Sequence, residues 1–267
     1  MRNHLWLHTR THLKFLARSR VLFGVAALVA VGTAIGMVPA FFFTTNANRF
    51  DVLRDIAQEL HWVAGTVTGG LGLLIVWSHR RQRSIKMIAT KPSPLEGWAA
   101  SVFLAAVLVG AVAHTSVAAV VFGLSWHWHV PYELGFAYYG AMQMLRSLIL
   151  LAVLTALGTA FHPVISFLVV LLFSESTFDG LGTLVAGAVQ AGIHTTALGA
   201  VLKGLKVVYW MAPTYSPMAY RMQWLRDSMR VPSGAWRYLL IGAGYALLAS
   251  AFGYLLMLTT LRRRSLI

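Results

Sequence analysis

Cysteine is absent from this chain of 267 residues. Disulfide frameworks, thiolate nucleophiles and cysteine-based zinc or iron–sulfur sites are therefore excluded. Charged side chains are also scarce: they make up 11% of the residues, against about 25% in an average soluble protein. Hydrophobic residues make up 58%, and a chain of this length cannot bury so much apolar surface in water. The composition excludes a soluble globular enzyme and predicts that the apolar surface faces lipid.

Acidic residues are much rarer than basic residues in this chain. Eight Asp and Glu stand against 22 Lys and Arg, which gives a formal net charge of +14. The basic residues lie mostly between apolar runs, so their distribution does not indicate a nucleic-acid interface. A glycine-rich phosphate loop ending in Gly-Lys-Ser or Gly-Lys-Thr is also missing. We therefore expect no ATP hydrolysis by that route in this chain.

Six apolar stretches are long enough to cross a hydrocarbon core of about 30 Å, which takes about 20 helical residues. They cover residues 21–43, 61–78, 94–124, 136–160, 164–202 and 238–261. The fifth is too long for one straight crossing and is interrupted by Glu175 and Asp179, so we expect one span followed by a re-entrant or interfacial segment. The sequence predicts an all-α polytopic membrane protein in a single transmembrane domain, residues 1–267.

The orientation of the spans follows from the basic residues, because short loops rich in Lys and Arg stay in the cytoplasm. Bases gather in residues 2–20, 80–91 and 262–264. We expect these segments, and so both termini, to be cytoplasmic, in a cell membrane such as the bacterial inner membrane. Counting spans then places residues 203–237 outside, with an interfacial helix, although this connection is itself basic.

Two of the segments that are expected to be cytoplasmic are also predicted to form helices. Residues 1–20 place bases every fourth position on one stripe and leucines on another, which is typical of an amphipathic helix at the membrane surface. The connection at 79–92 contains a short helix that presents Ile85 and Ile88 on one side. Ser93 then caps the third span, and Glu96 is placed to cap in return.

Three ionisable residues interrupt the predicted spans. Arg146 lies in the fourth span, and Glu175 and Asp179 lie in the fifth at a similar depth. Because a lone charge in a membrane is costly, such residues face the bundle interior or a water-filled path. We favour a structural ion pair between the two helices over a direct role in transport.

The histidines offer weaker signals. His114 and His194 are lone polar residues in apolar surroundings, and we expect each to form a hydrogen bond to a neighbouring helix. His127 and His129 lie at the outer edge of the third span and could ligate a metal or haem, but residues two apart converge only in an extended strand. We expect no metal site in this chain.

The order of these features resembles the permease subunit of ABC-2-type transporters. The similar elements are the basic amphipathic leader, the six spans, the cytoplasmic second-to-third connection and its Pro-Ser-Pro step, the His162-Pro163 turn, the Pro213–Pro217 segment and the basic tail at 262–266. Family members often carry Glu where this chain has only bases between Arg80 and Arg83. The resemblance implies the ABC-2 (type V-like) exporter fold.

The resemblance also implies partners and a coupling segment. Two permease copies, or one copy and a related chain, assemble with two cytoplasmic ATP-binding-cassette subunits, which bind ATP and Mg, so this chain is not expected to be an enzyme and needs no cofactor of its own. Nucleotide-driven closure passes to the spans through the coupling helix, here Ser84, Ile85, Lys86, Met87, Ile88 and Ala89. Export is the usual direction of transport.

Two other readings of the sequence stay open. One is a membrane-embedded enzyme that processes a lipid through Glu175 or Asp179, and the other is a metal or haem maturation factor that uses His127 and His129. A neighbouring gene for a Walker-type ATPase would favour the transporter over both.

Overall fold

The computed structural model describes residues 2–18, 46–81, 95–172, 200, 204, 229–231 and 233–265. Across these residues the protein is all-helical and contains no strand. The helices are α1 (Arg2–Arg18), α3 (Asn46–Arg81), α5 (Leu95–Trp128), α6 (Leu134–Ala160), α7 (Pro163–Leu172) and α11 (Ala235–Ser265). The predicted all-α class is therefore confirmed for this part of the chain.

Four of the described helices, α3, α5, α6 and α11, are long and apolar enough to cross a membrane. They contain the second, third, fourth and sixth predicted spans. The first predicted span lies outside the described residues, as do residues 173–199 of the fifth, which begins with α7. A membrane protein is supported by these four helices, and the number of six spans stays a prediction.

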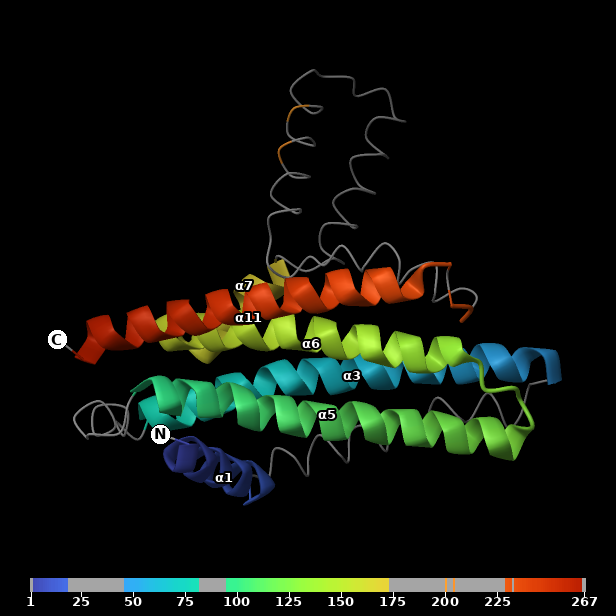
Figure 1. Cartoon of the computed structure of the whole chain (residues 1–267), viewed down its shortest axis with the longest axis horizontal. Coiled ribbons are helices and arrows are strands. Elements are labelled where there is room, and N and C mark those ends of the chain that lie inside the picture. Colours follow the sequence, from blue (N-terminus) through green and yellow to red (C-terminus); the bar gives the residue numbers. More distant parts are fainter. Residues whose placement is uncertain are drawn as a thin grey trace.

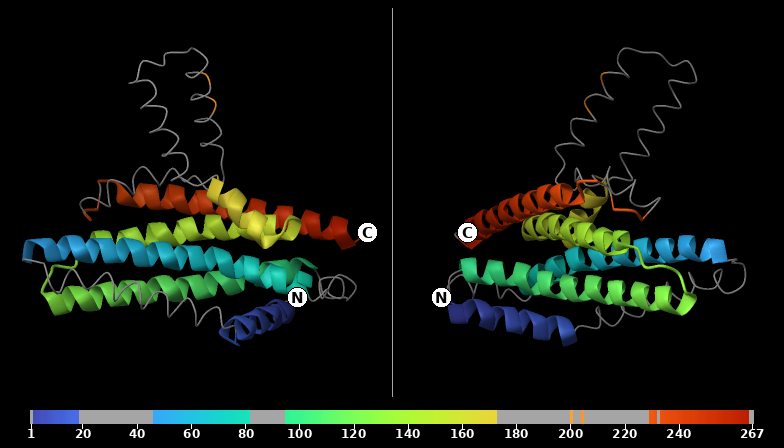
Figure 2. Two further views of the ribbon diagram at one scale, coloured as in Figure 1. Left: turned by 180° about the vertical axis from the view of Figure 1, so that it is seen from behind. Right: turned by 45° about the vertical axis from the view of Figure 1, so that its right-hand side comes forward.

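The four long helices lie side by side in one bundle (Figure 1). Helix α6 packs against α3 on one side and α11 on the other, and α5 packs against α3. Helix α5 runs in the opposite direction to the other three (Figures 1 and 2). Helix α1 packs against α5 at the end of the bundle where α11 finishes.

Side-chain contacts define that shared end of the bundle. Arg80, in the last turn of α3, donates to the carbonyl oxygens of Gly158 and Phe161 at the end of α6, at 2.7 and 2.6 Å. Arg262 near the end of α11 pairs with Glu96 in the first turn of α5. The ends of three helices and the start of the fourth thus meet at one end of the bundle. That this end is cytoplasmic stays a prediction.

The bundle interior is apolar over most of its length. One buried cluster joins α3, α5 and α6 around Leu60, Val121 and Met142. A second joins α3, α5 and α11 around Ile75 and includes Leu16 of α1. The outer face of α11, in contrast, leaves large apolar side chains exposed, as expected for a surface that faces lipid. Those exposed residues include Leu240, Leu247, Leu248 and Phe252.

Glycines set the close approach of α3 to α6. A Cβ atom built on Gly65 would lie 2.8 Å from Oγ of Ser147, and one on Gly69 would lie 2.8 Å from Cγ of Leu150. These two glycines are four residues apart, so they form a Gly-xxx-Gly pair at a helix contact.

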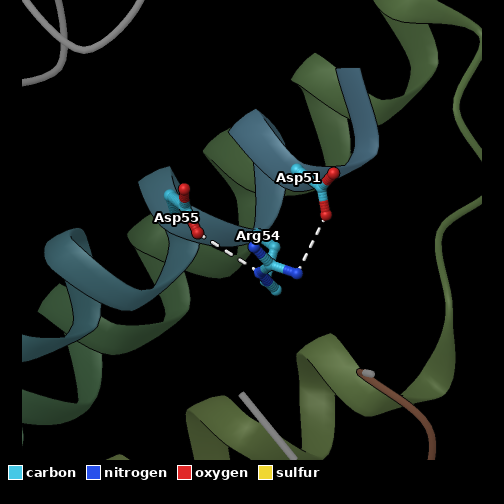
Figure 3. A network of polar contacts seen from close by, with 3 residues as sticks. All are labelled: Asp51, Arg54 and Asp55. Atoms are coloured by element: carbon cyan, nitrogen blue, oxygen red, sulfur yellow. Dashed lines mark hydrogen bonds and ion pairs between the residues drawn. The ribbon is translucent and has the colours of Figure 1, made fainter. Parts of the chain in front are cut away.

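Helix α3 starts earlier than predicted. The second predicted span begins at residue 61, but the helix begins at Asn46 and continues for 36 residues. At 1.5 Å per residue it is about 54 Å long, well beyond a core of about 30 Å. Its polar first turns are stabilised by Arg54, which lies 2.9 Å from Oδ1 of Asp51 and 3.2 Å from Oδ1 of Asp55 (Figure 3). Hydropathy overlooks such a segment because charged residues form helices equally well outside the apolar core.

Candidate functional site

Two histidines meet near the middle of the bundle. His61 comes from α3 and His114 from α5, and only 2% and 4% of their surfaces are exposed. Each lies close to the midpoint of its helix. Ionisable residues buried inside a bundle of membrane-spanning helices are rare and are commonly functional, so this pair is the candidate site.

A chain of hydrogen bonds links three helices through this pair. Nδ1 of His61 lies 3.0 Å from Nδ1 of His114, and Nε2 of His114 lies 2.9 Å from Oγ of Ser147 on α6. The Ser147 hydroxyl donates to the backbone carbonyl oxygen of Gln143 at 2.7 Å. The side-chain amide of Gln143 donates to the hydroxyl of Tyr139, also at 2.7 Å. All five side chains are buried.

The donors and acceptors of this chain are consistent with the following assignment of the ring protons. With the single Ser147 hydroxyl hydrogen given to the backbone oxygen of Gln143, Oγ accepts a hydrogen from Nε2 of His114. A neutral His114 then has no hydrogen on Nδ1, and His61 must donate from its own Nδ1. Nε2 of His61 is left as the unprotonated ring nitrogen.

Two glycines make room for the chain between the helices. Gly65 of α3 lies against Ser147, and a Cβ atom on Gly140 of α6 would lie 2.9 Å from Nε2 of His61. Any side chain at Gly140 would therefore press on the nitrogen of His61 that carries no hydrogen.

A second histidine cluster lies where α1 packs onto the bundle. The ring of His12 lies edge-on to those of His79 and Trp98, with centroids 5.3 and 6.1 Å apart. His12 is 2% exposed and Trp98 is 1% exposed. Within the described residues, Nε2 of His12 and Nε1 of Trp98 have no hydrogen-bond partner. Burial, with a smaller contribution from His79 and His8, lowers the pKa of His12 from 6.5 to about 3.

Only some of the predicted site residues lie in the part of the chain that the structure describes. Arg146 is partly buried on α6, while Glu175 and Asp179 lie outside the described residues. Their ion pair therefore stays a prediction. The predicted coupling residues Ser84–Ala89 lie outside as well, and so does Ser93. Glu96, expected to cap the helix start, forms its ion pair with Arg262.

The remaining histidine predictions can be compared with the described residues. The expected hydrogen bond from His114 to a neighbouring helix is present, to α3 and to α6. His127 and His129 are both exposed, and no group of three or more possible metal ligands occurs in the described part of the chain. His194 lies outside it.

Sequence reasoning missed His61 as a site residue, because it was taken only as the first residue of a span. Two signals in the sequence point to it: histidine is the sole ionisable residue type shared by the second and third predicted spans, and the glycine pair at 65 and 69 follows one turn later. Neither signal names the partner, which is 53 residues away in the chain.

Comparison with protein-family models finds no match, and comparison with curated proteins finds none either. The functional argument therefore depends on the residues and their geometry.

Proposed function

We propose that this chain is the membrane-spanning permease subunit of an ABC-2-type transporter, works as an exporter and is driven by a separate ATP-binding subunit. Support comes first from the order of the sequence features, and second from four helices that are suited to crossing a membrane. The main structural support comes from the contacts made by the described residues on either side of the 82–94 connection. Each flank is fastened to a different helix of the bundle.

Arg80 holds the first flank. Its guanidinium donates to two carbonyl oxygens at the end of α6 and lies 6.0 Å from the ring of Trp77. The Trp77 ring packs edge-on against His162, at the turn between α6 and α7. A cation at the C-terminal end of a helix satisfies carbonyl groups that have no partner within the helix. A force applied to the connection would therefore reach α6 and α7 through one arginine.

Glu96 holds the second flank through its pair with Arg262 of α11. Tyr254 of α11 adds a hydrogen bond to the backbone oxygen of Glu96, at 3.2 Å. A push on the connection would thus be passed to α6 through Arg80 and to α11 through Glu96. A coupling segment has to pass such a push from an ATPase to the spans.

The test is co-purification of the tagged chain with an ATP-binding-cassette ATPase from its native membrane. Replacing Ile85 and Ile88 with Asp should release the ATPase, because apolar anchors at the centre of an interface carry most of its binding energy. Arg80→Ala should leave the ATPase bound but abolish the effect of the permease on its rate of ATP hydrolysis. Arg81→Ala is the matched control, since this neighbouring side chain is exposed.

Two outcomes would contradict the proposal. If the wild-type chain retains no ATPase, the transporter assignment fails. If Arg80→Ala and Arg81→Ala behave alike, the coupling route is wrong while the assignment stands. Turnover of a lipid by the purified chain alone would favour the membrane-embedded enzyme.

A further inference from the structure

The arrangement of the two central histidines decides what can lie between them. Their planes are 17° apart and their centroids are 5.2 Å apart, while the two Nδ1 atoms are separated by 3.0 Å. The centroid distance is close to the nitrogen separation plus the two ring radii. Both nitrogens therefore lie almost on the line that joins the rings and point at each other. This is the geometry of a straight hydrogen bond.

A bridging metal does not fit this geometry. An ion midway between the two nitrogens would lie 1.5 Å from each, half of the 3.0 Å separation. Zinc requires about 2.0–2.1 Å to a histidine nitrogen and takes its ligands at tetrahedral angles. The head-on approach of the rings fits a single hydrogen and nothing larger.

The neutral pair keeps one vacant position for a proton. Nδ1 of His61 already donates to His114, and Nε2 of His114 already donates to Ser147. A further proton can bind at Nε2 of His61 without breaking either bond. His61 then carries the charge, and its hydrogen bond to His114 becomes charge-assisted and stronger.

We propose that His61 and His114 form one proton-binding site in the middle of the bundle, in which an added proton is shared between α3 and α5. When the Nδ1–H bond of His61 breaks and a new Nδ1–H bond forms on His114, the positive charge passes to His114. His61 is left neutral with its hydrogen on Nε2, and the number of protons is unchanged. Ser147 accepts from Nε2 of His114 in both states, so α6 is tied to the pair throughout.

The groups around the pair leave the charge to the two histidines. His61 interacts electrostatically with His114, and the α6 group facing it is the Tyr139 phenol, whose ring centroid lies 6.0 Å away. Tyr138, its neighbour on α6, donates to the backbone oxygen of Ala235 on α11. No carboxylate of the described residues hydrogen-bonds to either histidine. The added charge is stabilised by being shared.

The experiment is nitrogen NMR of the full chain, labelled with ¹⁵N-histidine and reconstituted in lipid nanodiscs. At high pH, one buried ring should carry its hydrogen on Nδ1 and the other on Nε2. As the pH falls, both sets of signals should change together at one midpoint. His61→Gln and His114→Gln assign the two rings, because glutamine keeps a hydrogen-bonding side chain in each position.

In each variant, the remaining histidine should no longer change over the wild-type range. His127→Gln, an exposed histidine on the same helix α5, should leave the shared midpoint in place. The wild-type spectra suffice if a variant fails to fold. Two separate midpoints, equal tautomers in the two rings or no change with pH would overturn the proposal. So would a histidine that titrates unchanged after its partner is replaced. This test is independent of the transporter assignment, since no ATPase is present.

Discussion

The two buried histidine clusters of this protein are opposites. In the middle of the bundle, His61 and His114 join three helices through an unbroken series of hydrogen bonds. Where α1 meets the bundle, His12 and Trp98 are equally buried, yet one nitrogen of each has no partner in the described structure. The first cluster resists separation of its helices, because opening it would leave polar atoms unsatisfied in an apolar interior.

The second cluster has the opposite energetics. Two buried polar atoms without partners oppose the docking of α1, and both would gain hydrogen bonds to water if the helix moved away. Docking depends instead on apolar contacts such as Leu16, which is fully buried among residues of α3, α5 and α11. Separating the helices at the centre of the bundle therefore costs hydrogen bonds, whereas separating α1 from the bundle does not cost hydrogen bonds of His12 Nε2 or Trp98 Nε1.

The largest effect is expected from breaking the central cluster. His114→Leu removes the acceptor for His61 and the donor to Ser147, and each buried group without a partner costs about 1–3 kcal/mol. The free energy of unfolding in detergent should fall by a comparable amount. The double variant with His61→Leu should lose less than the sum of the two single variants, because no half of the pair is left behind. Additive losses would show that the two rings are not coupled.

A smaller, pH-dependent effect is expected at α1. Because the pKa of His12 falls from 6.5 to about 3 on docking, the undocked state binds more protons between these values. Docking is then fully favourable above pH 6.5 and weakens as the pH falls toward 3, by at most about 1.4 kcal/mol per pH unit. Spin labels on cysteines at Arg10 and Arg263, both exposed, would report the separation of α1 from α11.

The control for this titration is His12→Phe, which removes the imidazole whose pKa falls when α1 docks. His8 and His79 also face His12, so a part of the pH dependence is expected to remain. An unchanged pH profile in His12→Phe would contradict the role given to this histidine.

The smallest effect, and the sharpest comparison, comes from making one substitution in both clusters. At neutral pH, His12→Phe should raise the unfolding temperature or leave it unchanged, since it removes a polar atom without a partner, worth about 1 kcal/mol. His61→Phe makes the same change at a ring that is hydrogen-bonded across the helices, and it should lower that temperature. Thermal unfolding of the two variants in one detergent measures both signs. Equal destabilisation would remove the distinction between the clusters.

Much of the fold could be predicted from the sequence. The apolar runs locate α3, α5, α6 and α11 because the membrane demands about 20 apolar residues per crossing. The start of α3 could not be found this way, because its first turns contain the charged residues Asp51, Arg54 and Asp55 and so do not belong to an apolar run. Helix α1 lies within the range predicted from its two stripes.

The candidate site was harder to predict. His114 was expected to bond to a neighbouring helix, and it does, but its partners depend on which helices lie next to each other. A hydrophobic pattern does not fix that choice, because every span is apolar on most sides. The spacing of Gly65 and Gly69 indicated a close helix contact without naming α6 as the neighbour. The charges at Arg146, Glu175 and Asp179 drew attention first because their cost in a membrane is greater than that of a neutral histidine.

The sequence distance between the partners of α3 has a consequence for biosynthesis. His61 bonds to a residue made 53 positions later, and Arg80 bonds to carbonyl oxygens 78 and 81 positions later. Chains are synthesised from the N-terminus, so α3 leaves the ribosome before any of these partners exists. Until α5 and α6 follow, its imidazole and guanidinium groups must be kept hydrated or held by the insertion machinery. These polar contacts of α3 are therefore completed only after α6 has been synthesised.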